Sequence, residues 1–254
     1  MEIIIFVSIL ISLIFAPLGC FVLWKRYINF GEGLAHSSLL AIVMSVIFGL
    51  PSIYAGIINT LFFALLVFKF KLKSGNNAAI GLTSSIMVSL ALVLTHIFPG
   101  RFNFSSLFFG DIIAATTLDA YILCLILIIT SIFLITTFHR LILIILSKDI
   151  AYSRNLPVNL LEFLFLSILS FAIIATIKIV GALLVTSMLL IPAMISRLVS
   201  KTPSMMILYS VIFAQAMNFI GISLSFYGDL PFAPIVILSG GIIYIIFYLI
   251  QKRK

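Results

Sequence analysis

A glutamate and a histidine four residues apart, Glu32 and His36, stand in an apolar stretch near the start of the sequence. In a helix this spacing puts both side chains on one face. A carboxylate and an imidazole on one face are suitable ligands for a divalent cation such as zinc, manganese or iron. The same residues also fit a carboxylate favoured by the dipole at a helix start and a hydrogen-bonded core histidine. Their spacing alone does not decide between the two interpretations.

Three further ionisable residues are candidates for the same metal route. His96 lies near the end of a long apolar run, and Asp111 and Asp229 lie in the connections between such runs. Taken alone, each of them fits a capping or loop residue better than a metal ligand. They are therefore secondary candidates beside Glu32 and His36.

The segment SKDIAYSRNLPV, residues 147–158, is the longest mixed-charge, loop-like stretch in the sequence. We expect it to form a short helix that a partner protein holds in a groove. The residues that we expect to make this contact are Lys148, Asp149, Tyr152, Arg154, Leu156 and Pro157.

Small residues and a proline mark the stretch VGALLVTSMLLIPAMISRL, residues 180–198. Gly181 and Ser187 would let neighbouring helices approach closely, and Pro192 can kink a helix. Ordinary packing in a helical bundle accounts for the same pattern, so spacing alone assigns no function here.

The composition indicates that these residues lie in a membrane. Of the 254 residues, 63% are hydrophobic and 9% are charged, whereas a soluble domain has about 25% charged residues. The apolar runs are continuous and close to twenty residues long, which predicts helices rather than the alternating strands of a barrel. We therefore expect an all-α, polytopic helical bundle that forms one domain over residues 1–254.

Nine apolar runs in the sequence are long enough to span a bilayer. They cover approximately residues 3–23, 31–50, 53–68, 78–98, 119–138, 158–177, 180–198, 205–227 and 235–250. Some of these runs are short or contain proline, so eight spans with one re-entrant segment is the alternative.

The basic residues predict the orientation of the chain. With the N-terminus outside, thirteen Lys and Arg residues fall on the inner side, and the outer connections hold Arg101 and Lys178. This positive-inside pattern puts the C-terminus and residues 147–158 in the cytoplasm, and His96, Asp111 and Asp229 on the outer side. The net charge of +8 arises from these connections, so we expect membrane lipid as a partner and no nucleic acid.

The sequence contains no GxxxxGK[ST] loop to hold phosphate, and no HExxH, CxxC or GxSxG motif. We therefore expect a protein that is not an enzyme. If ATP drives it, a separate subunit must bind the nucleotide.

The motifs together resemble the permease subunit of metal-ion ABC importers, the zinc, manganese and iron uptake family. GEGLAHSSL, residues 31–39, is similar to that family's GDALSHA-type motif, with Glu32 in place of the usual aspartate and His36 on the family's histidine. The other similar segments are NNAAIGL (76–82), LFFGDI (107–112), AYSRNLPV (151–158), VGALLVTSMLLIPAMISRL (180–198) and GDLPFAPIVIL (228–238). The resemblance extends over nearly the whole chain.

The sequence departs from the family pattern at Asn76 and Asn77, which replace carboxylates, and at Ala233, which replaces a glycine. The resemblance implies a homodimer of permeases, cytoplasmic ATPase subunits that contact residues 151–158, and an outer metal-binding protein. It implies transported zinc, with manganese or ferrous iron as alternatives, and no tightly bound cofactor. It also implies location in a bacterial inner membrane.

A stand-alone proton- or sodium-coupled carrier is the alternative from another class. Such a carrier needs coupling carboxylates at mid-membrane and two related halves, whereas the clear carboxylates here lie near span ends. A non-transporting membrane scaffold leaves Glu32, His36 and the 147–158 segment without a role. Uptake that survives the loss of every partner ATPase would favour the carrier.

Overall fold

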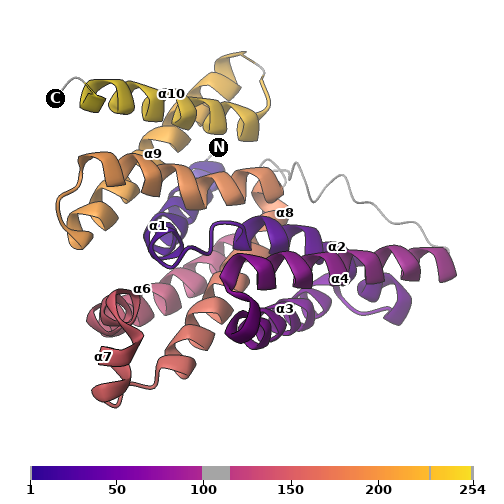
Figure 1. Ribbon diagram of the computed structural model, residues 1–254. Helices are drawn as coiled ribbons and strands as arrows, with labels where there is room; N and C mark the ends of the chain where they lie inside the picture. The colour runs from indigo at the N-terminus through magenta and orange to yellow at the C-terminus, as the bar shows by residue number, and fades with distance from the viewer. Residues whose placement is uncertain (1, 99–114, 229, 253–254) are drawn as a thin grey trace. The chain divides into compact units, whose positions relative to one another are not determined.

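The computed structural model describes residues 2–98, 115–228 and 230–252, and within them the chain is helical apart from short connections (Figure 1). The helices are α1 Glu2–Trp24, α2 Phe30–Phe48, α3 Ser52–Ser74, α4 Asn76–Ile97, α6 Thr117–Leu146, α7 Lys148–Ser153, α8 Val158–Val199, α9 Pro203–Gly228 and α10 Phe232–Lys252. No strand occurs in these described ranges. The predicted all-α fold class is confirmed.

Eight helices of the described chain are long and apolar enough to cross a membrane, one fewer than the nine predicted spans. The difference lies in α8, where the predicted spans 158–177 and 180–198 form one helical element of 42 residues. The backbone is nevertheless non-helical at Gly181, with φ 78° and ψ 163°. At about 1.5 Å per residue a straight helix of this length would measure about 60 Å, roughly twice the hydrocarbon thickness. The segments on either side of Gly181 are therefore two helices joined at a break.

Helix α6 is longer than predicted, because the apolar residues that follow His139 and Arg140 continue the helix instead of forming a connection. It reaches Leu146, whereas the predicted span ended at residue 138. The short helix expected within residues 147–158 is confirmed as α7.

The contacts between residues divide the chain into two compact units. The first comprises Met1–Trp24, Ser105–Leu127 and Ala175–Lys254, and the second comprises Lys25–Phe104 and Ile128–Ile174. The predicted single domain over residues 1–254 stays a prediction, as does the orientation of the termini.

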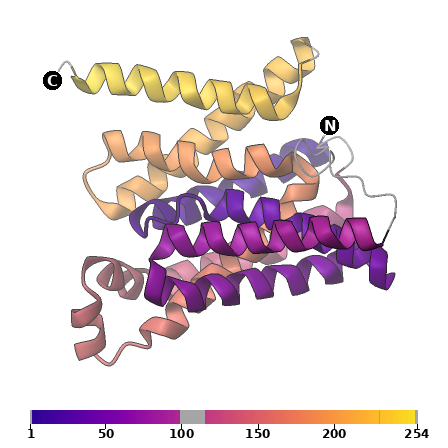
Figure 2. The same cartoon turned by 45° about the vertical axis from the view of Figure 1, so that its right-hand side comes forward.

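In the second unit α2, α3 and α4 all pack against one another, as Figure 2 shows. Residues 49–51 connect α2 to α3, and Gly75 alone connects α3 to α4. Because these connections are so short, the helices alternate in direction, and α2 and α4 run the same way. Gly33 brings α2 and α4 together, since a Cβ at this position would lie 2.7 Å from the Ile80 side chain.

In the first unit α9 packs against both α1 and α10. Helix α1 approaches the second part of α8 closely at Gly19. A Cβ at this position would lie 1.8 Å from the carbonyl oxygen of Leu189. Close packing of α1 against α8 therefore requires a glycine at position 19. Gly181 lies at the break in α8, and the packing role expected for Gly181, Ser187 and Pro192 stays a prediction.

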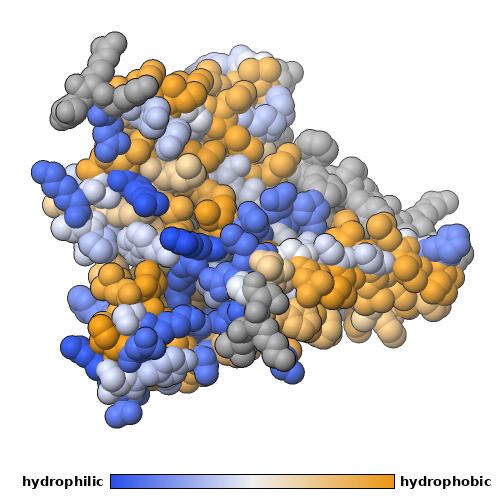
Figure 3. All heavy atoms as spheres, in the orientation of Figure 1, coloured by the Kyte–Doolittle hydropathy of each residue, from blue (hydrophilic) through white to orange (hydrophobic). Residues whose placement is uncertain are grey.

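Large apolar side chains cover the outside of the helices. Tyr121 is 77% exposed, Ile135 78% and Phe219 74%. In the second unit the flank around α4 is mostly apolar, whereas hydrophilic residues gather around α7 (Figure 3). Exposed apolar surface on this scale is unsuited to water and suits lipid, so the chain is a multi-pass membrane protein.

Candidate metal-translocation site

Glu32 and His36 lie on the first two turns of α2, the helix at the centre of the three-helix packing in the second unit. The Glu32 side chain is exposed and His36 is half-buried, while the residues between them are buried. Glu32 belongs to the first turn, where the helix dipole favours a carboxylate. The i, i+4 spacing therefore places both groups on the accessible side of a helix whose other faces are packed.

The imidazole of His36 is turned back onto its own helix. Its Nδ1 lies 3.0 Å from the backbone carbonyl oxygen of Glu32. A carbonyl oxygen can only accept, so Nδ1 carries the hydrogen, and the lone pair of the neutral ring is on Nε2. Histidines that bind metals usually donate their other ring N–H to a carbonyl or carboxylate in this way. The hydrogen bond thus sets the tautomer that a metal ligand needs.

The other metal candidates do not complete the site. His96 is exposed in the last turn of α4. Because Gly33 lies opposite Ile80 and the two helices run the same way, His96 lies about 20 Å further along the helix axis than His36. Asp111 and Asp229 lie outside the described residues. Within the described ranges, no group of three or more His, Cys, Asp or Glu side chains could hold a metal ion.

Helix α7 and the residues that follow it carry the side chains that the sequence predicts to contact a partner. The Ser147 hydroxyl caps it by accepting from the Ile150 N–H at 3.3 Å, and buried Ala151 anchors it. Asn155, with φ 54°, ends the turn that follows. Of the six predicted contact residues, Leu156 is half-buried and the others are exposed: Lys148, Asp149, Tyr152, Arg154 and Pro157.

The sequence analysis did not single out Glu162, which lies at the centre of a charged cluster in the second unit. Its carboxylate lies 3.7 Å from Lys25 Nζ and 3.2 Å from Lys148 Nζ, and it also pairs with Lys71 Nζ. The Glu162 side chain is 6% exposed. The sequence did contain a signal for Glu162, because it is an ionisable residue within the apolar run that begins at residue 158. Such residues are costly in a membrane and usually functional.

Aromatic rings complete the surroundings of the buried ammonium groups. Lys25 Nζ lies 5.6 Å from the centre of the Phe165 ring, and Lys71 Nζ lies 4.4 Å from that of Phe68, distances typical of cation–π contacts. Burial lowers the pKa of Lys25 to about 8, although the Glu162 carboxylate opposes this change. Burial also raises the pKa of Tyr27, and the negative charge of Glu162 adds to that effect.

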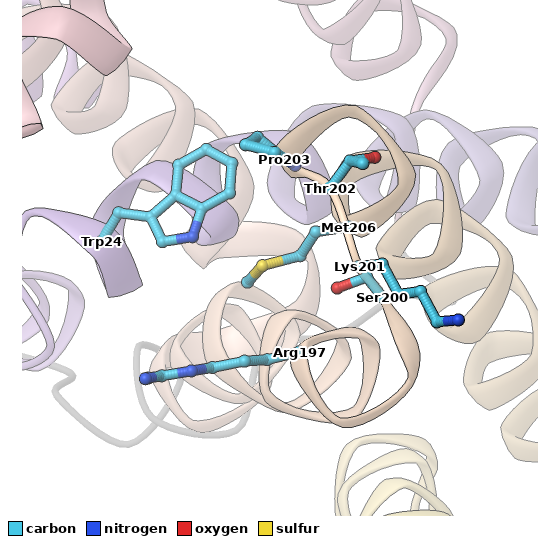
Figure 4. A pocket seen from close by; sticks show the side chains of 7 residues that line it. All are labelled: Trp24, Arg197, Ser200, Lys201, Thr202, Pro203 and Met206. Carbon is cyan, nitrogen blue, oxygen red and sulfur yellow. The ribbon is translucent and has the colours of Figure 1, made fainter.

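The first unit contains a pocket of about 220 Å³ at the connection between α8 and α9, shown in Figure 4. The residues that line it are Trp24, Arg197, Ser200, Lys201, Thr202, Pro203 and Met206. Two of them are cations, and none offers a carboxylate, imidazole or thiolate. The pocket therefore does not suit a divalent metal ion.

The sequence model of the ABC 3 transport family matches residues 1–251. The chain belongs to the ABC 3 transport family. Family membership favours the ABC permease over the stand-alone carrier and the scaffold. This member of the family is a membrane-spanning transport subunit.

Relatives of this ABC 3 family member are similar over nearly their full lengths. It is 28% identical to the high-affinity zinc uptake system membrane protein ZnuB of Buchnera aphidicola subsp. Acyrthosiphon pisum, over 94% of this chain and 93% of the relative. It is 23% identical to the manganese import system permease protein ScaB of Streptococcus gordonii, over 97% of this chain and 90% of the relative. The solved structure of PsaBC from Streptococcus pneumoniae in complex with Fab has the same fold, with a TM-score of 0.83 at 21% identity over 97% and 90%.

Proposed function

We propose that this chain is the permease of an ATP-driven importer of divalent metal ions, and that zinc is its substrate. The observation that carries the proposal is the pair Glu32 and His36 on the accessible side of α2, with the His36 tautomer set by the Glu32 carbonyl. Support for zinc comes from the zinc uptake relative. Manganese is the second candidate because the ScaB relative is named for manganese import.

Two ligands suit an ion in transit. A structural zinc ion usually takes four protein ligands, which hold it permanently. One carboxylate and one imidazole replace part of the hydration shell of an ion and still allow it to leave. A second copy of the chain across the path would supply the same pair again, which supports the proposed homodimer.

The energy comes from a separate cytoplasmic ATPase that binds the exposed face of α7. The sequence has no phosphate-binding loop of its own, and α7 offers charged and aromatic side chains at a helix end. A metal-binding protein delivers the ion to the outer side, and ATP-driven movement of α7 switches the side on which the path is open. These partners and the orientation are parts of the proposal.

Uptake into vesicles tests this function. Vesicles would contain the chain, its candidate ATPase and its candidate binding protein, and would receive labelled zinc with excess unlabelled manganese or iron, with and without ATP. We expect ATP-dependent zinc uptake that excess manganese does not suppress. Suppression by manganese would shift the substrate to manganese, and uptake that is indifferent to ATP would overturn the ABC mechanism.

A further inference from the structure

Four segments of the second unit meet at the Glu162 carboxylate. Glu162 lies in the second turn of α8. Its three partners are Lys25, before α2; Lys71, near the end of α3; and Lys148, the first residue of α7. One carboxylate therefore contacts the proposed ATPase-binding helix and the segment that leads into the metal-ligand helix.

We propose that Glu162 is a positioning residue that transmits movement of α7 to α2, and that its pair with Lys148 is the contact that opens and closes. The inference rests on the proposed function, because that function makes α7 the ATPase contact and α2 the metal-ligand helix. It adds the residue that links the two.

The cluster has a fixed part and a breakable part. The side chains of Lys25 and Lys71 are 5% and 3% exposed, so separating either from Glu162 would leave buried charges without compensation. The Lys148 side chain is 56% exposed. Water can solvate its ammonium group, so its ion pair with Glu162 breaks at little cost.

The fixed part is joined to the start of α2. The Lys25 carbonyl accepts a hydrogen bond of 2.9 Å from Asn76 Nδ2 at the start of α4. The next residue, Arg26, has φ 58°, and the Phe30 N–H donates to the Tyr27 carbonyl at 2.9 Å. The connection from Lys25 to α2 is thus a tight turn, so a shift of Lys25 moves the first turns of α2, which carry Glu32.

The test compares two neutralised carboxylates in the assembled complex of this chain with its ATPase. Glu162→Gln removes the charge at the centre of the cluster. Asp119→Asn is the matched control, because Asp119 is also buried and also pairs with a largely exposed lysine, Lys178, at 3.6 Å. Glu162→Asp keeps the charge and serves as the conservative variant.

Hydrogen exchange of the α2 amides, with and without a non-hydrolysable ATP analogue and without metal, is the first measurement. We expect the nucleotide to change exchange over residues 30–40 in the wild type, in Asp119→Asn and partly in Glu162→Asp. In Glu162→Gln we expect at least a fivefold smaller change. An unchanged response in Glu162→Gln overturns the inference.

The second measurement is the amount of zinc transported per ATP hydrolysed in vesicles. We expect this ratio to fall at least fivefold in Glu162→Gln, while the ATPase still co-purifies. If the wild type hydrolyses ATP without moving any metal, the proposed substrate fails, but the exchange experiment still decides the role of Glu162.

Glu162→Gln leaves both Lys25 and Lys71 buried without a carboxylate, so it can fail to assemble. The triple variant Glu162→Gln, Lys25→Met, Lys71→Met removes both buried positive charges as well, and then takes its place in both measurements. We expect it to assemble and to remain uncoupled. If the triple variant also fails to assemble, the cluster is purely structural and the inference is wrong.

Discussion

His36 is the residue on which the proposed metal path depends most directly. Its Nδ1–H donates to the Glu32 carbonyl, so Nε2 is the ring nitrogen that would ligate a metal ion. The proposed metal path requires this tautomer of His36. The adjacent serines, Ser37 and Ser38, donate to carbonyls of their own helix and are buried, so they are structural.

We expect His36→Ala to lower zinc uptake at least about tenfold at limiting zinc, because loss of a group that merely orients a metal ligand already costs about 10- to 100-fold. The complex with the ATPase should assemble normally. The control is His139→Ala, which removes an exposed histidine from α6. Equal uptake by His36→Ala and the wild type at limiting zinc would remove His36 from the path.

At the residue scale, Lys25 makes the stability of the folded protein depend on pH. Burial lowers its pKa to about 8 in the folded protein, from the ordinary lysine value of 10.5. Between these two pH values the unfolded chain binds more protons at this site, so the folded state gains stability as the pH rises. Below pH 8 the lysine is charged in both states, and the full cost of burying its charge is present.

We therefore expect the wild type to gain stability relative to Lys25→Met, by up to about 1.4 kcal/mol per pH unit between pH 8 and 10. The other ionisable groups around the site are present in both proteins: Glu162, Lys71, Lys148 and Tyr27. Thermal unfolding in detergent over this range measures the difference. Parallel curves for the two proteins would contradict the lowered pKa.

At the scale of elements, the break in α8 is the feature that most affects the path of the chain. Gly181, with φ 78° and ψ 163°, occupies a backbone region that is essentially restricted to glycine. The helices on either side are apolar and regular, so the break depends on this one residue.

We expect Gly181→Ala to destabilise the protein by about 1–3 kcal/mol, because an L residue is strained in this conformation. The matched control is Gly241→Ala in α10, where a Cβ would meet nothing within 4 Å. That substitution should be neutral, or stabilising by up to about 1 kcal/mol, since alanine favours a helix over glycine. Equal unfolding temperatures for the two variants would show that residue 181 tolerates a side chain.

At the scale of the whole molecule, the described part of the chain has a lipid-facing apolar surface and a short helix, α7, with exposed charged side chains between long apolar helices. Helix α7 is only six residues long, yet it has a side-chain cap and an anchoring buried alanine. A short helix fixed in this way suits a contact that transmits force, which supports its assignment to the ATPase.

We expect Arg154→Glu to weaken the complex with the ATPase at least tenfold, because it reverses an exposed charge on the proposed contact surface. Co-purification at several salt concentrations measures this. Arg140→Glu, an exposed arginine on α6, is the matched control and should leave the complex intact. Wild-type recovery of the ATPase with Arg154→Glu, or equal loss with both variants, would argue against a specific α7 contact.

The sequence by itself determined the membrane class, most helices, the short α7 helix and the shared face of Glu32 and His36. These features follow from local physics: apolar runs must satisfy their backbone within a helix, and the i, i+4 spacing fixes a face. Tertiary structure alone decided three others. Glu162 pairs with Lys25, which lies 137 positions earlier in the sequence. Gly19 packs against Leu189. His96 lies far from His36 along the helix axis. No local pattern encodes which side chains of different helices meet, because that depends on how the helices pack.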